Sequence, residues 1–241
     1  MYTPLDALPE LTEEYRQAEQ QAVLNASVLY EFELAKESPH DYGNIIIWVL
    51  GAIFQLWLGS LLSWPGILVS LVLISAIGSY LYYAGNPDVK QTVTLTKKGL
   101  IVTELTLVPD ACYTALRYSG YAGIAISVVG VALVGPMMFV GAGAGLLMSF
   151  KMAGIVNKPR VNVFPFHHAL NYEVNNALAV KYKHGLIQRH ISPMIEIEHD
   201  GSVREKLFIE QLNFYYMCYA ASPEQQSELL THLKKVITIS E

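Results

Sequence analysis

The chain has 241 residues, of which 52% are hydrophobic and only 15% are charged, and its formal net charge is −5. Soluble globular domains carry about 25% charged residues, so this composition argues against an ordinary soluble protein. The acidic balance and the lack of a basic patch with interleaved aromatic residues exclude nucleic acid as a partner, because phosphate repels an acidic surface. The two cysteines, Cys112 and Cys218, fit no metal-binding or redox spacing.

Residues 1–40 are predicted to form an N-terminal amphipathic helix that begins near Leu11 and runs to Lys36. Thr12 can cap this helix, and Glu13 and Glu14 suit the positive end of its dipole. Apolar residues recur every three or four positions and form one stripe. Because the polar face is acidic, the stripe is expected to pack on the protein's own domain and not on a membrane surface.

Residues 42–84 are predicted to form a first transmembrane hairpin. No charged residue lies between Asp41 and Asp88, and about 20 apolar residues are enough to span a bilayer. The sequence Ser-Trp-Pro-Gly at 63–66 is expected to form the turn. Trp64 at this turn and the tyrosines at 80–83 lie where interfacial aromatic residues are expected.

Residues 118–153 are predicted to form a second transmembrane hairpin, divided near Gly135 and Pro136. The alternative is a single tilted span that is kinked at Pro136. Lysine and arginine residues flank this block on both sides, and such flanks favour the cytoplasm. Two cytoplasmic flanks require an even number of crossings, which favours the hairpin and places both termini in the cytoplasm, with the protein in an inner or plasma membrane.

The remaining residues, 86–117 and 156–241, are predicted to form one cytoplasmic α+β domain. Alternating residues at 92–96 and 100–108 predict a β-hairpin, which is expected to pair with strands beyond residue 160 because two strands alone are marginal in water. Ser222 and Pro223 are expected to begin a C-terminal helix that runs to about Val236. Further strands are expected at 161–164, 177–182, 194–199 and 203–209.

The predicted fold class is therefore an α-helical integral membrane protein with two helical hairpins and four spans. Its cytoplasmic domain is α+β, mostly antiparallel β with a C-terminal helix. A series of small residues in the second hairpin, spaced four apart, predicts close helix packing within the hairpin or between subunits of a homo-oligomer. This series consists of Gly141, Gly145, Ser149 and Ala153.

Residues that could carry chemistry are scattered, and none is assigned a catalytic, cofactor-binding or metal-binding role. Glu196 and Glu198 share one face of a predicted strand, which indicates a solvated or partner-binding face. The aromatic run 213–219 indicates a buried strand or the start of the last helix. The histidines lack any metal-ligand spacing and are interpreted as surface or half-buried residues; they are His167, His168, His184, His190 and His199.

The predicted function is non-catalytic: a membrane scaffold, sensor or assembly factor that presents its cytoplasmic domain to a protein partner. No cofactor is expected. A small channel or transporter subunit is the first alternative, but the predicted spans contain no charged residue of the kind that ion and proton pathways retain. A membrane enzyme that acts at the interface is the second alternative, and it lacks a recognisable catalytic motif.

Overall fold

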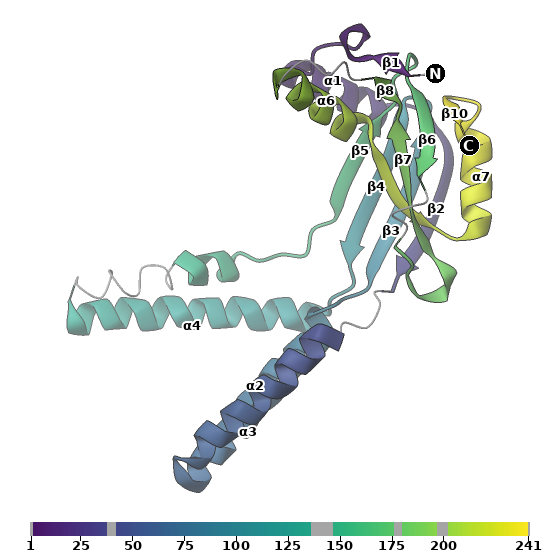
Figure 1. Cartoon of the computed structure of the whole chain (residues 1–241). Helices are drawn as coiled ribbons and strands as arrows, with labels where there is room; N and C mark the ends of the chain where they lie inside the picture. Colours follow the sequence, from purple (N-terminus) through teal and green to yellow (C-terminus); the bar gives the residue numbers. More distant parts are fainter. Residues whose placement is uncertain (1, 38–41, 136–146, 176–179, 197–201, 241) are drawn as a thin grey trace. The chain divides into compact units, whose positions relative to one another are not determined.

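The computed structural model describes residues 2–37, 42–135, 147–175, 180–196 and 202–240. The chain divides into two compact units. Unit 1 consists of residues 1–39, 89–105 and 159–241, and unit 2 consists of residues 40–88 and 106–158. Figure 1 shows the elements of both units, and each unit is described by itself.

Unit 1 begins with the short strand β1 (Thr3–Pro4) and the 3-10 turn η1 (Leu5–Ala7), which are followed by helix α1 (Glu13–Leu24). The predicted cap is confirmed, because the Thr12 side chain accepts a hydrogen bond from the Tyr15 amide at 3.2 Å. The predicted length of this helix is wrong. The chain leaves the helix at Asn25 and continues as strand β2 (Val28–Lys36), so residues 28–36 belong to a sheet.

The first sheet has the strand order β2-β3-β4-β5. The hairpin of β3 (Val89–Thr96) and β4 (Gly99–Thr106) lies where the alternating residues predict it. β4 pairs antiparallel with β5 (Arg160–Pro165), with Gly99 opposite Pro165 and Glu104 opposite Arg160. The predicted pairing between the hairpin and a strand beyond residue 160 is therefore confirmed.

The second sheet has the strand order β10-β6-β7-β9. Pairing is antiparallel except where β10 runs parallel to β6. A separate parallel pair joins β1 to β8 (Ile195–Glu196). Of the strand predicted at 177–182, residues 177–179 lie outside the described residues and Lys181 forms one bridge with Ile187. The strands of this sheet are β6 (Asn171–Asn175), β7 (Ile187–Pro193), β9 (Met217–Ala221) and β10 (Thr238–Ser240).

Two further helices complete unit 1. The strand predicted at 203–209 is wrong, because these residues lie in helix α6 (Ser202–Tyr215). The C-terminal helix is confirmed as α7 (Pro223–Leu233). Its first turn is fixed by a capping box, in which the Ser222 side chain accepts from the Gln225 amide and the Gln225 side chain accepts from the Ser222 amide.

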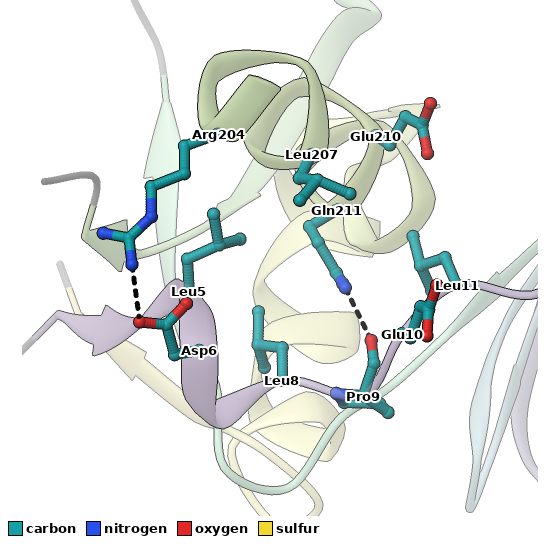
Figure 2. A pocket seen from close by; sticks show the side chains of 10 residues that line it. All are labelled: Leu5, Asp6, Leu8, Pro9, Glu10, Leu11, Arg204, Leu207, Glu210 and Gln211. Carbon is teal, nitrogen blue, oxygen red and sulfur yellow. Dashed lines mark hydrogen bonds and ion pairs between the residues drawn. The ribbon is translucent and has the colours of Figure 1, made fainter. Parts of the chain in front are cut away.

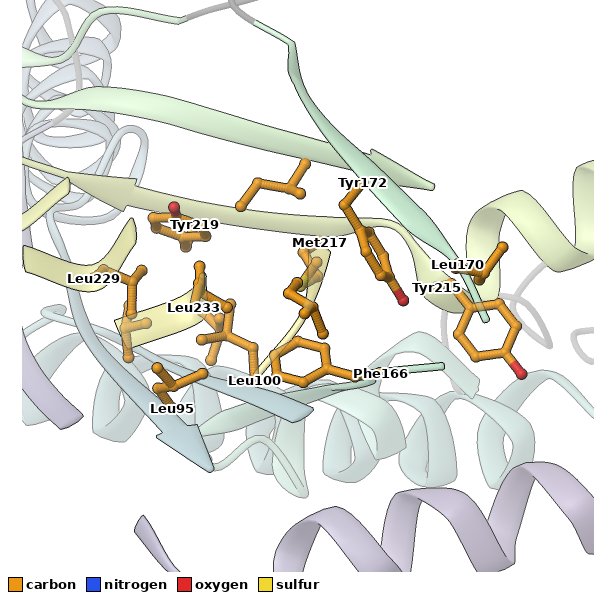
Figure 3. Close-up of a cluster of buried hydrophobic side chains, with 14 of the residues drawn as sticks. Leu95, Leu100, Phe166, Leu170, Tyr172, Tyr215, Met217, Tyr219, Leu229 and Leu233 are labelled. Carbon is orange, nitrogen blue, oxygen red and sulfur yellow. The ribbon is translucent and has the colours of Figure 1, made fainter. Parts of the chain in front are cut away.

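The core of unit 1 forms where side chains of both sheets meet those of α7 (Figure 3). Leu95 and Leu100 come from the first sheet, Met217 and Tyr219 from the second, and Leu229 from α7. A buried side chain also joins the sheets, since Gln91 on β3 accepts a hydrogen bond from the Ala220 amide on β9 at 3.0 Å. Burial of apolar area of this kind is the main favourable contribution to folding.

Unit 2 contains a hairpin of two apolar helices, α2 (Tyr42–Ser60) and α3 (Ser63–Ala84). The turn lies at residues 61–62, slightly before the predicted Pro-Gly sequence, and Ser63 has a positive φ of 66°. Pro65 lies in the first turn of α3, where a proline disrupts no helical hydrogen bond. Gly59 and Gly66 let the helices approach, because a Cβ on Gly59 would lie 2.7 Å from the Gly66 carbonyl oxygen.

The second apolar block of unit 2 contains helix α4 (Asp110–Val134) and a helical stretch at 147–153. These two segments pack closely, since a Cβ on Gly120 would lie 2.6 Å from the Ala153 amide nitrogen. Pro136, Gly141 and Gly145 lie outside the described residues. Among the described residues, three helices are long and apolar enough to cross a membrane, namely α2, α3 and most of α4. The coarse prediction of an apolar helical part beside an α+β domain therefore holds, whereas four spans are not confirmed.

Candidate functional site

A groove of about 290 Å³ lies on unit 1 between the N-terminal segment and helix α6 (Figure 2). Four of the lining side chains are apolar: Leu5, Leu8, Leu11 and Leu207. Four are charged: Asp6, Glu10, Arg204 and Glu210. Pro9 and Gln211 complete the lining. No sequence motif pointed to this groove, because its two walls are far apart in the chain.

The N-terminal wall of the groove is held by backbone pairing. β1 lies parallel to β8, and the Thr3 amide donates to the Met194 carbonyl at 2.9 Å. The buried Thr3 hydroxyl donates to the Ala169 carbonyl at 2.8 Å. The chain then turns through η1, where the Leu8 amide donates to the Leu5 carbonyl. These bonds hold residues 3–11, the segment before α1, against the rest of unit 1; this segment is called the N-terminal strap.

Helix α6 forms the opposite wall and bonds directly to the strap. The Gln211 side-chain amide donates to the Pro9 carbonyl at 2.7 Å, and Arg204 forms an ion pair with Asp6 at 3.3 Å (Figure 2). The Oε1 atom of Gln211 is buried and has no hydrogen-bond partner among the described residues. An unpaired buried acceptor of this kind costs about 1–3 kcal/mol.

The groove combines apolar side chains with an acidic rim. Leu207 keeps 45% of its surface exposed, and Glu10 and Asp6 are exposed beside it. Glu210 forms an ion pair with Arg16 of α1 at 3.3 Å, and the Arg16 guanidinium lies 5.6 Å from the centre of the Phe214 ring. The lining thus carries three carboxylates and one guanidinium, which favours a ligand with an apolar part next to a cation.

A second polar cluster lies between the two sheets and is interpreted as structural. Lys36 forms an ion pair with Glu104 and lies 5.8 Å from the centre of the Tyr182 ring. Gln188 accepts a hydrogen bond from the Tyr182 hydroxyl and donates to the Cys218 sulfur. Burial raises the pKa of the Cys218 thiol, which keeps it protonated and a poor nucleophile.

The structure does not bring the described histidines together. The His167 ring lies 5.6 Å from the Tyr215 ring, His184 Nε2 lies 3.0 Å from the Glu37 carboxylate, and His190 is hydrogen-bonded to Tyr216. His199 lies outside the described residues. Within the part of the chain that the structure describes, no group of three or more His, Cys, Asp or Glu residues could hold a metal ion.

The other residues singled out from the sequence lie in different places. Glu196 is exposed at the end of β8, and Glu198 lies outside the described residues. The aromatic run spans the end of α6 and the start of β9, and its members Tyr215 and Tyr219 are almost fully buried. Ser149 packs against Gly123 of α4, which is a contact within unit 2.

The polar groups that line the groove are three carboxylates, one guanidinium and one amide. The groove is suited to binding one side chain or a short segment of a partner.

Comparison with known proteins decides the family. The sequence profile of the TsiV2 immunity protein family matches residues 12–183, which is more than half of the chain. The chain belongs to the TsiV2 immunity protein family. One curated relative, the immunity protein TsiV2 of Vibrio cholerae serotype O1, is 40% identical over 68 residues. That match covers 28% of this chain and 28% of the relative. No solved structure matches the chain significantly.

Membership of the TsiV2 immunity protein family corrects the function expected from the sequence. The scaffold, sensor or assembly-factor interpretation is wrong, and so is the channel or transporter alternative, because the matched family is one of immunity proteins. The description as a multi-pass membrane scaffold is corrected with it: the structure supports only that three described helices are apolar and long enough to span a membrane. The expectation of a protein partner agrees with the family, whereas homo-oligomer formation has no support.

Proposed function

We propose that this chain is an immunity protein, which protects the cell that makes it by binding a toxic effector protein and blocking its action. The observation that carries the proposal is the profile match over residues 12–183. The relative from Vibrio cholerae is also named as an immunity protein. Protection of this kind needs a binding surface, and the groove on unit 1 is the candidate for that surface.

Survival in mixed culture tests the proposal. The gene for the chain is deleted in the organism that encodes it, and the deletion strain is grown in contact with its parent. We expect the deletion strain to be killed by the parent and to survive when the full chain is restored from a plasmid. Equal survival of the deletion strain with and without the plasmid would contradict the proposal, provided that the parent kills a second, unrelated sensitive strain.

We also propose that unit 2 is inserted in the inner or plasma membrane, with unit 1 on the cytoplasmic side. The support is that most apolar side chains of α2, α3 and α4 are exposed, and exposed apolar helices of this length suit lipid. The packing of residues 149–153 against α4 supports a returning helix and therefore four spans.

Thiol labelling of intact cells tests this placement. After Cys112 and Cys218 are replaced by serine, single cysteines are introduced as Leu5→Cys, Lys98→Cys and Trp64→Cys. We expect an impermeant thiol reagent to label position 64 alone, because Trp64 lies at the turn between α2 and α3. Labelling at position 98 in intact cells would show that unit 1 lies outside the cytoplasm.

A further inference from the structure

We infer that the groove between the N-terminal strap and α6 is the surface that selects the effector, and that it receives an apolar side chain of the effector next to a lysine or arginine. This inference rests on the proposed immunity function and names the chemistry of its partner. It uses only contacts within unit 1, in which both walls of the groove are joined by hydrogen bonds and an ion pair.

The two walls of the groove come from segments that are far apart in the sequence. Its walls come from residues 5–11 and 204–211, and the family profile matches residues 12–183. The groove therefore lies entirely outside the matched segment. Immunity proteins must discriminate one effector from others, and discrimination depends on surfaces that differ between related binders. The residues that form the groove lie outside the segment that the family profile matches.

The groove presents exposed apolar surface. Leu207 is 45% exposed, and the half-buried Leu5, Leu8 and Leu11 lie against the same cavity. A cavity of about 290 Å³ is large enough for an inserted side chain. Side chains that fill an interface pocket and lose all contact with water dominate binding energy. An apolar side chain of the effector would bury these leucines.

The rim of the groove is acidic. Asp6 and Glu210 are each paired with an arginine, but their side chains remain 75% and 40% exposed. Glu10 is exposed and has no ion pair among the described residues. A cationic group of the effector complements these carboxylates, and rim charges of this kind steer association and set specificity.

A matched pair of substitutions on α6 tests the inference. Leu207 and Ile209 have nearly equal exposure, 45% and 46%, but they lie about 200° apart around the helix. Only Leu207 lines the groove. In the survival assay with the full chain, Leu207→Lys should reduce protection at least tenfold, because a charged side chain blocks the pocket and repels the cation. Ile209→Lys should protect like the unchanged chain.

A second pair of substitutions, at Glu10 and Glu14, tests the acidic rim of the groove. Glu10→Lys should also reduce protection at least tenfold, and Glu10→Gln should have a smaller effect. Glu14→Lys, at an exposed position of α1 outside the groove, should have none. Immunoblots of membranes show whether each variant accumulates. If Leu207→Lys fails to accumulate, Glu10→Lys decides the question.

The outcomes separate the two proposals. If the unchanged chain gives no protection, the immunity function itself fails. If the unchanged chain protects and the Leu207→Lys and Glu10→Lys variants accumulate and protect equally well, the function stands and the groove is not the effector site. Loss of protection in the Ile209→Lys and Glu14→Lys controls as well would show that surface charge in general matters, and would also overturn the groove as the selective surface.

Discussion

At the scale of single side chains, the partly buried His167 is expected to make the stability of the protein sensitive to acid. Burial lowers the pKa of His167 below its ordinary value of 6.5, and it outweighs the opposing effect of Glu19. The neighbouring His168 adds to the lowering, and the Nδ1 atom of His167 has no hydrogen-bond partner among the described residues. The folded state therefore holds this ring neutral at a pH where the unfolded chain takes up a proton.

The free energy of unfolding is therefore expected to depend on pH. The stabilisation is present above pH 6.5 and is lost as the pH falls through the lowered pKa, because protons bind the unfolded chain first. We expect the free energy of unfolding to fall below pH 6.5 and the His167→Asn variant to show a flatter profile. Denaturant titrations of the solubilised chain across this range measure both. An unchanged profile in His167→Asn would assign the acid sensitivity to other groups.

Among secondary-structure elements, the start of α7 is held by Ser222, whose side chain accepts from the Gln225 amide at 3.2 Å. Replacement of such a cap by alanine costs about 0.5–2 kcal/mol. We expect Ser222→Ala to lower the free energy of unfolding by about this amount. Ser227→Ala, at an exposed position inside the same helix, should be neutral or slightly stabilising because alanine favours helix. Equal effects in the two variants would show that the cap contributes little.

The hairpin of α2 and α3 offers a sharper comparison between two glycines. A Cβ on Gly59 would meet the Ser70 hydroxyl and lie 2.7 Å from the Gly66 carbonyl oxygen, whereas a Cβ on Gly51 would meet nothing within 4 Å. Overpacking of this kind costs about 1–3 kcal/mol. We expect Gly59→Ala to lower the thermal stability of the detergent-solubilised chain and Gly51→Ala to leave it unchanged or raise it. A Gly59→Ala variant as stable as Gly51→Ala would mean that the helices separate easily.

Some elements could be predicted from the sequence because they depend on local signals. The alternation in β3 and β4 and the Ser-Pro start of α7 are of this kind. The sequence predicts helix where β2 lies because the leucine, glutamate and lysine residues of this segment are good helix formers. Tyr30, Phe32 and Leu34 do alternate with polar or small residues there, but pairing with β3 decides the outcome. At 203–209 the sequence predicts a strand, whereas the structure has helix α6, in which Leu207 and Gln211 lie four positions apart on the face that lines the groove.

For the molecule as a whole, unit 1 is expected to fold without unit 2. Lys36 lies opposite Val89 in the first sheet, and Glu104 lies opposite Arg160, so the ends left by removal of residues 40–88 and 106–158 are close together. We expect a chain in which short glycine–serine bridges replace these two segments to be soluble and to unfold cooperatively. Circular dichroism during denaturant titration measures this. Aggregation of this protein, with no cooperative transition, would show that unit 1 needs unit 2.

The candidate groove could not be predicted from the sequence. Asp6 and Arg204 are 198 positions apart, and no local pattern indicates that they form an ion pair. The N-terminal strap is held mainly by backbone bonds to β8 and by the side chain of Gln211. Such contacts depend on the folded sheets and leave no periodicity in the sequence. Composition and hydropathy, by contrast, were sufficient to locate the apolar helices.

The distance along the chain between the two walls of the groove has a consequence for synthesis. The ribosome releases Asp6 long before it reaches Arg204, 198 residues later, and the strap has no wall to pair with in the meantime. Contacts so distant in sequence form late and slowly. An interrupted or degraded chain that stops short of α6 can therefore carry the complete family-matched segment, residues 12–183, and still present no groove. Under the proposed effector site, only chains that have been translated at least through α6 could bind the effector.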